Sequence, residues 1–155
     1  MDARERNGLS RRGFFAAAGA GVLAAAGVSG SARAALPETN AAIAKEFGSG
    51  PYKQGRVHLK TPIIAENGRV VPIQVTVESP MSDGDYVKKV AVFVQENPLP
   101  DVAIFHFTPA CGKAWVKTNC RMGKTSPIIA VAEMSDGSVY TTKSTVKVTI
   151  GGCGG

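Results

Sequence analysis

Val71-Pro72-Ile73-Gln74-Val75-Thr76-Val77-Glu78 is the stretch that decides the fold class. Apolar side chains alternate with polar ones, which is typical of a strand with one face on a core. Pro72 lacks a backbone donor, so we expect this strand to start at an edge or a bulge. About seven such short stretches, separated by turn signals, predict an all-β fold, an immunoglobulin-like antiparallel β-sandwich.

The remaining strands are expected on both sides of this stretch. Asn67-Gly68 is a hairpin turn signal. The run Val102 to Phe107 is apolar nearly throughout, as a strand buried on both faces would be. Val146, Val148 and Ile150 form the last inward stripe, so we expect the core to end one residue before Gly151. The other expected strands lie at Val57 to Leu59, Val87 to Val94, 113–122, Pro127 to Met134 and Val139 to Thr142.

A short helix is predicted ahead of the strands. Pro37-Glu38-Thr39-Asn40 opens it with Thr39 or Asn40 as its cap, and Ile43 and Phe47 share one face. Gly48 supplies a left-handed end. With 155 residues the chain is expected to form one domain, which we place at residues 35–150.

The first 34 residues have the composition of an export signal. Ser10-Arg11-Arg12-Gly13-Phe14-Phe15 is a twin-arginine signature, in which Arg11 and Arg12 are the paired arginines, and an apolar run rich in Ala and Gly follows. Ala32-Arg33-Ala34 offers small residues where a signal peptidase reads, so we expect cleavage after Ala34. Residues 1–34 are therefore predicted to be a twin-arginine signal peptide that directs the chain to the periplasm.

Charge and hydropathy exclude two classes of partner. Five of the 18 Lys and Arg and two of the 12 Asp and Glu lie in residues 1–34, which leaves a net charge of +3 beyond them. A nucleic-acid-binding protein would need a clustered basic face. No stretch is long and apolar enough for a membrane span. We therefore expect neither nucleic acid nor membrane as a partner.

The chain ends in Gly151-Gly152-Cys153-Gly154-Gly155. Glycine resists ordering more than any other residue, so four of them around one thiol predict a flexible, swinging arm over 151–155. The thiol can range roughly 10 Å from Ile150. We interpret Cys153 as a carrier thiol around which catalytic sites can close, and the alternative is a disordered end whose cysteine has no role.

The segment 146–155 resembles the C-terminus of the SoxY family, the sulfur-carrying subunit of the periplasmic thiosulfate-oxidising system. Glu66-Asn67-Gly68 before a Val-Val-Pro strand and Val-Ala-Glu-Met-Ser-Asp-Gly at 131–137 resemble the family too. The resemblance extends from about residue 37 to the end. It implies that Cys153 binds thiosulfate through its outer sulfur, and that separate Sox enzymes load, hydrolyse and oxidise the sulfane intermediates.

The resemblance also implies a carrier without catalytic residues or a cofactor of its own. A SoxZ-like subunit without a signal would form a heterodimer with this chain and leave the cell as its passenger. Two other functions stay open. One is a ubiquitin-like sulfur carrier charged as a terminal thiocarboxylate, which the export signal opposes. The other is a non-catalytic exported sandwich that binds another protein.

The other cysteines, the histidines and the single tryptophan are not expected to form a reactive site. Cys111 and Cys120 cannot form a disulfide if 113–122 is one strand, because nine extended residues span roughly 30 Å. Cys120 is expected to be a buried, inert thiol, and Cys111 lies in a turn with no clear role. His58 and His106 lack the further ligands of a copper or zinc site, so no metal is expected. Trp115 faces outward between lysines, either as an interface anchor or as an ordinary surface residue.

Overall fold

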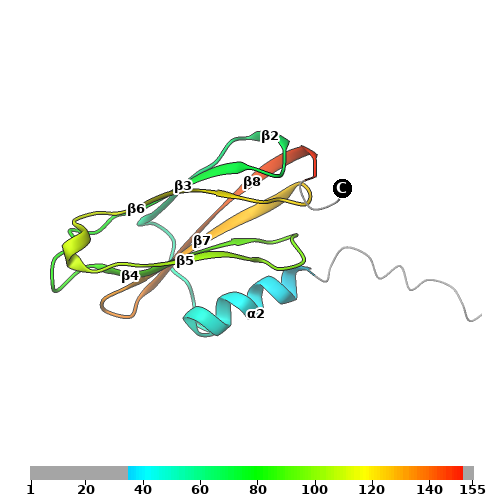
Figure 1. The fold of residues 1–155 in the computed structure, drawn as a ribbon. Helices are drawn as coiled ribbons and strands as arrows, with labels where there is room; N and C mark the ends of the chain where they lie inside the picture. Colours follow the sequence, from blue (N-terminus) through cyan, green and yellow to red (C-terminus); the bar gives the residue numbers. More distant parts are fainter. Residues whose placement is uncertain (1–34, 152–155) are drawn as a thin grey trace, which may run out of the picture. The chain divides into compact units, whose positions relative to one another are not determined.

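The computed structural model describes residues 35–151. They form two β-sheets packed face to face, with one helix against the larger sheet (Figure 1). The two-sheet sandwich predicted from alternation is thus confirmed. The elements are α2 (Ala35–Phe47), β1 (Val57–Lys60), β2 (Ile64–Asn67), β3 (Val71–Val77), β4 (Val87–Val94), β5 (Asp101–His106), η1 (Pro109–Cys111), β6 (Ala114–Cys120), β7 (Ser126–Met134) and β8 (Val139–Ile150).

The smaller sheet has the strand order β1-β3-β6, and all its pairings are antiparallel. The alternating stretch forms β3, whose odd-numbered residues from Val71 to Val77 are buried. Strand β1 pairs with β3 only from Gln74 onward. Pro72 therefore lies where one side of β3 has no neighbouring strand, which is where a residue without a backbone donor is tolerated.

The larger sheet has the order β2-β8-β7-β4-β5. Its central strands β4 and β7 are buried along most of their length, because the smaller sheet covers one face and α2 the other. All pairings are antiparallel except that of β2 with β8, which is parallel. This parallel pair was not predicted, since the sequence signals indicated only hairpins.

Helix α2 covers a second, smaller core on the outer face of the larger sheet. Ile43 is buried against Ala91, Phe93 and Val131, and Phe47 packs at the edge of this cluster. Gly48 has a φ of 79°, so the predicted left-handed helix end is confirmed. No described helix is long and apolar enough to cross a membrane.

Other details of the prediction were wrong. Helix α2 begins at Ala35, so neither Thr39 nor Asn40 caps it, and Thr39 instead donates a hydrogen bond to the Gln95 carbonyl (3.2 Å). The Asn67-Gly68 turn joins strands of different sheets, so it forms no hairpin. The other two corrections concern β5 and the end of β8.

Strand β5 is an edge strand with alternating partial exposure, and it is not buried on both faces. Its apolar composition therefore does not reflect central burial. Strand β8 runs unbroken through both segments predicted separately at its two ends. Val146 is buried and Val148 packs on the core, but Ile150 is 67% exposed. The core therefore ends at Val148.

Candidate functional site

The predicted carrier residue Cys153 lies outside the described residues, together with Gly152, Gly154 and Gly155. Arg11 and Arg12 of the predicted export signal lie outside them as well. The described part of the candidate site is the end of β8 and Gly151, from which the chain continues to the cysteine. We call these residues, Thr149 to Gly151, the arm root.

Three neighbouring segments hold the arm root in place. The Gly68 amide, in the turn after β2, donates a hydrogen bond to the Ile150 carbonyl (2.8 Å). Thr149 Oγ1 donates to the carbonyl of Glu66 in β2 (3.1 Å). One residue before the arm root, the Val148 amide donates to Thr125 Oγ1 beyond β6 (3.0 Å). The base of the arm is therefore held on one side by the backbone of β2 and its turn, and on the other by the side chain of Thr125.

Gly151 is packed directly against the backbone of Gly123. A Cβ atom at residue 151 would overlap the Gly123 carbonyl oxygen, and no side chain is present there that could move aside. Glycine is therefore required at residue 151 for close approach. We predicted this glycine as part of a flexible arm. Its close approach to Gly123 is a separate reason for glycine at this position, which composition could not indicate.

The loop that contacts Gly151 is itself fastened to the loop after β4. Asn97 donates a side-chain hydrogen bond to the Arg121 carbonyl (2.7 Å) and accepts one from the Gly123 amide (3.1 Å). Lys124 pairs with Glu96 (3.0 Å), and this hydrogen bond lowers the pKa of the Glu96 carboxyl. The arm root thus rests on two loops that are tied to each other.

Among the exposed large apolar side chains, three belong to the end of β8 and to the turns and loops linked to it. They are Val70 (63% exposed), Leu99 (79%) and Ile150 (67%). Val70 follows the turn that bonds to Ile150, and Leu99 lies two residues after Asn97. Figure 1 shows these segments at the same end of the sandwich as the end of β8. We call these three residues the arm-root collar.

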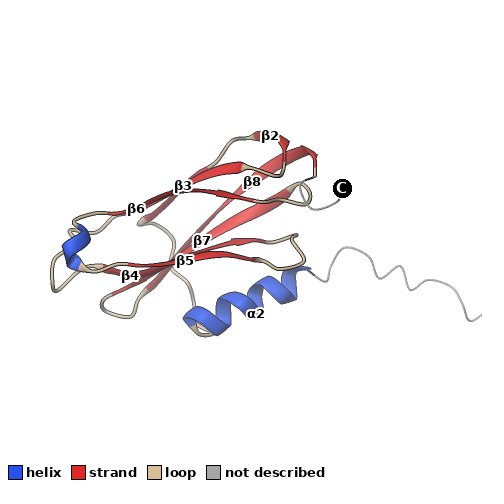
Figure 2. Cartoon of the chain, viewed as in Figure 1, coloured by secondary structure: helices blue, strands red, loops and turns tan. Residues whose placement is uncertain are grey.

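The two internal cysteines lie far from each other, as predicted. Strand β6 runs unbroken from Ala114 to Cys120, and both thiols are free. Cys120 is buried, and this burial raises the pKa of its thiol to about 11. Cys111 is exposed in η1, which Figure 2 shows at the opposite end of the sandwich from the end of β8. Neither internal thiol is therefore part of the arm root.

The histidines are apart and belong to different sheets. The His58 side chain in β1 pairs with the Glu78 side chain (2.6 Å) on the exposed face of the smaller sheet, which is an ordinary hydrogen bond at a strand position. His106 ends β5, where it lines a surface hollow with Lys88 and Lys89. Within residues 35–151 no three metal-ligating side chains converge. Trp115 is 46% exposed, so its predicted outward orientation is confirmed.

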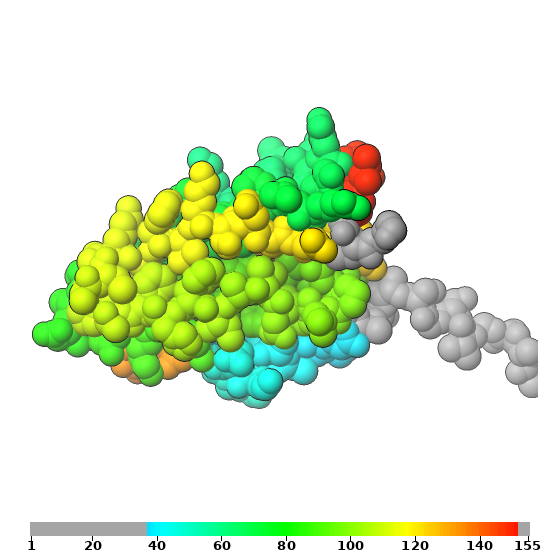
Figure 3. Space-filling model, viewed as in Figure 1, coloured from blue at the N-terminus to red at the C-terminus, as the bar shows by residue number. Residues whose placement is uncertain are grey.

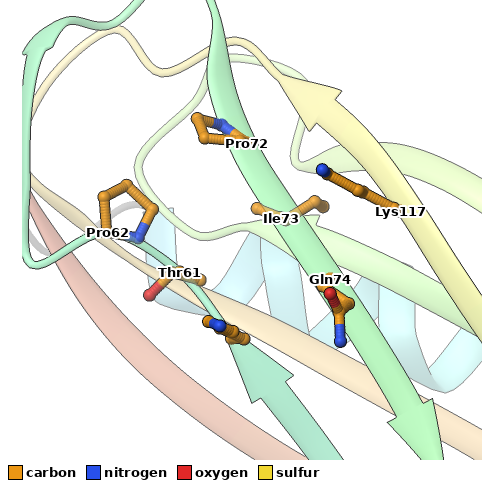
Figure 4. A pocket seen from close by; sticks show the side chains of 7 residues that line it. Thr61, Pro62, Pro72, Ile73, Gln74 and Lys117 are labelled. Carbon is orange, nitrogen blue, oxygen red and sulfur yellow. The ribbon is translucent and has the colours of Figure 1, made fainter.

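A pocket of about 290 Å³ opens beside β3 where β1 ends (Figure 4). The missing strand neighbour at Pro72 leaves this space, and Pro62 in the β1–β2 connection closes its other side. The pocket is lined by Lys60, Thr61, Pro62, Pro72, Ile73, Gln74 and Lys117. Its lining contains no acidic residue and no thiol.

Comparison with protein families matches residues 43–153 to the model described as sulfur oxidation protein SoxY. Among solved structures, a sulfur carrier protein SoxY from Chlorobium limicola f thiosulfatophilum is 31% identical with a TM-score of 0.63. That match covers 74% of this chain and 94% of the other. The family match therefore includes β8, the arm root and the candidate cysteine position.

Superoxide reductases share the fold at low identity. The neelaredoxin of Ignicoccus hospitalis is 12% identical with a TM-score of 0.55, covering 61% of this chain and 80% of the other. A putative superoxide reductase from Thermotoga maritima is 18% identical with a TM-score of 0.51, covering 63% and 87%. These likenesses concern the sandwich alone. No curated protein matches the chain.

Proposed function

Because this chain belongs to the SoxY family of sulfur oxidation proteins, we propose that it is a sulfur carrier that holds its cargo on the thiol of Cys153. The observation that carries this assignment is the family match, which runs through the fixed arm root and ends at residue 153. Cys111 and Cys120 offer weaker candidates, because Cys111 lies at the other end of the sandwich and Cys120 is buried.

The proposed cargo is thiosulfate, attached through its outer sulfur. A new S–S bond between the Cys153 thiolate and thiosulfate gives Cys153–S–S–SO₃⁻ and releases two electrons. An electron-accepting enzyme of the Sox system takes these electrons during loading. Hydrolysis by a second enzyme then adds water, releases sulfate and two protons, and leaves a persulfide anion on the cysteine. The carrier supplies the nucleophile and no catalytic groups.

The partners and the compartment belong to the same proposal. A SoxZ-like subunit forms a heterodimer with this chain, and separate enzymes load, hydrolyse and oxidise the bound sulfur. Residues 1–34 act as a twin-arginine signal, so that carriage takes place in the periplasm. The mild positive charge beyond residue 34 suits anionic sulfur compounds.

Mass spectrometry after incubation with thiosulfate and the complete Sox system tests this proposal. We expect an added mass on the peptide that contains Cys153 and no added mass on those with Cys111 or Cys120. Cys153→Ser should abolish thiosulfate-dependent turnover and leave the melting temperature unchanged, because residue 153 lies beyond the core. An adduct on Cys111 or Cys120 with Cys153 bare would contradict the proposal.

Removal of Gly155 provides the matched control against a thiocarboxylate carrier. A thiol carrier lacking this residue should turn over near the wild-type rate, since the attachment point is retained. A thiocarboxylate carrier would lose all activity. Wild-type activity in Cys153→Ser would instead indicate a sandwich that serves only to bind another protein.

A further inference from the structure

We infer that the arm-root collar is the surface on which processing enzymes dock when they take up Cys153. The matching surface on those enzymes is an apolar rim around the opening that admits the thiol. This inference rests on the proposed role of Cys153. It goes beyond that role by identifying the surface of the sandwich that contacts the enzymes.

The length of the chain beyond the arm root limits where an enzyme can bind. Gly151 is fixed against Gly123, and Cys153 is only two residues further along. The Cα atoms of residues 151 and 153 can be at most roughly 7 Å apart. An active site that accepts the thiol must therefore open close to Gly151, and the protein around this opening must meet the residues that surround the arm root.

The collar supplies exposed apolar side chains from the segments that meet at the arm root. Single exposed apolar side chains are common on protein surfaces. Here, however, Val70 and Leu99 come from two loops and Ile150 ends β8. These segments are linked by the Gly68–Ile150 and Asn97–Gly123 hydrogen bonds and by the close approach of Gly123 to Gly151. Figure 3 shows the end of β8 beside the surface of the β2–β3 segment on this face. Such a cluster around a functional residue is typical of an interaction site.

Charge contributes little to this docking surface. Arg69 and Arg121 are exposed beside the collar, and so are Glu66 and Asp101, so that charges of both signs offset each other. Release of water from apolar surface is then the main source of affinity. Association through the collar is therefore expected to change little with ionic strength, unlike association by electrostatic steering.

Kinetics with the carrier as the varied substrate tests the inference. Leu99→Ser and Val70→Ser should each lower kcat/KM of the loading and hydrolysing enzymes about tenfold, mainly through KM. The rate at which iodoacetamide alkylates Cys153 should stay unchanged, because the arm itself is intact. Leu99 is a loop residue that contributes little to the core, so its variant should fold even if Val70→Ser does not.

Ile104→Ser is the matched control, since Ile104 in β5 is a 40% exposed apolar residue outside the collar. Its kcat/KM should stay within about twofold of wild type. Wild-type kcat/KM in Leu99→Ser would overturn the docking surface, as would a steep loss of kcat/KM with added salt. In either case, a sulfur adduct on Cys153 of the wild-type carrier would leave the proposed function standing. Absence of that adduct from the wild-type protein would contradict the proposed function itself.

Discussion

At the scale of single residues, the two internal thiols differ most in exposure. Cys111 is exposed and Cys120 is buried with a pKa raised to about 11. At pH 8, iodoacetamide should therefore modify Cys111 in the native protein and leave Cys120 unmodified, because the thiolate is the reactive form. In denaturant both should react. A disulfide-linked peptide pair of these two residues would contradict the structure.

The same burial predicts how stability depends on pH. Because the Cys120 pKa is higher in the folded than in the unfolded chain, the folded state binds the proton more tightly. The free energy of unfolding keeps the full contribution of the protonated thiol below pH 9. It should then fall by roughly 2 kcal/mol as the pH rises toward 11. Urea unfolding at pH 8 and pH 10.5 measures it. Cys120→Ala should remove the part of the pH dependence that comes from this thiol.

Gly151 should be intolerant of a side chain because of its contact with Gly123. Gly151→Ala is expected to lower the free energy of unfolding by about 1–3 kcal/mol, since backbone must move to admit the methyl group. Thermal unfolding measures this change. Gly50→Ala is the control, because a Cβ at Gly50 would meet nothing within 4 Å. Equal melting temperatures for Gly151→Ala and wild type would show that the arm root is not fixed there.

Gly152 and Gly154 are expected to matter for turnover and not for stability. A carrier cysteine enters several narrow sites, and each entry requires backbone conformations that residues with a Cβ adopt less readily. Gly152→Val and Gly154→Val should lower steady-state thiosulfate oxidation steeply, with loading and unloading affected unequally, and alanine should be milder. The melting temperature should stay unchanged. Wild-type turnover of both valine variants would contradict the swinging arm.

At the scale of elements, the most buried apolar side chain of helix α2 is Ile43. Ile43 is 5% exposed and packs on Ala91 and Phe93 of β4. Ile43→Ala should lower the free energy of unfolding by about 2–4 kcal/mol, through lost burial and the cavity it leaves. Chemical denaturation measures this change. Lys45→Ala, on the exposed side of the helix, should change stability by less than about 0.5 kcal/mol.

The elements that the sequence predicted well are those with one face on the core. Strands β3 and β6 alternate because one side of each packs between the sheets and the other meets solvent. Strand β5 was misjudged, since an apolar run does not distinguish a central strand from an edge. The turn at Gly68 is a local signal and carries no information about which sheet the next strand joins. The β2–β8 pairing depends on residues about 80 positions apart in the chain.

The candidate site also has a part that local sequence features predict and a part that depends on tertiary packing. The prediction of Cys153 as the carrier residue rests on a local feature of the sequence, a cysteine among glycines, and it stays a prediction because this residue lies outside the described ones. The contact of Gly151 with Gly123 and the exposure of Val70, Leu99 and Ile150 could not be predicted, because they depend on how separate parts of the chain pack. The sequence therefore supplies the predicted attachment residue, and the structure was needed to find the packing of Gly151 and the exposed side chains of the arm-root collar.

At the scale of the whole molecule, export should depend on the paired arginines at the start of the chain. Arg11→Lys combined with Arg12→Lys should leave uncleaved precursor in the cytoplasm, which immunoblots of cell fractions would detect. A partner subunit without its own signal should remain there too. Single replacement of Arg33 by Lys is the control, since it leaves the pair intact. A partner that still reaches the periplasm in the double variant would exclude export as a complex.

Strand β8 lies inside the larger sheet, between β2 and β7, although it is the strand that leads directly into Gly151. During synthesis, a chain broken off before Val139 would lack this internal strand and leave β2 and β7 unpaired along one side. Such a fragment should stay unfolded and open to proteases. A folded sandwich therefore requires translation to have passed into β8, so chains that stop before this strand are expected to be degraded and not to persist as carriers without the thiol.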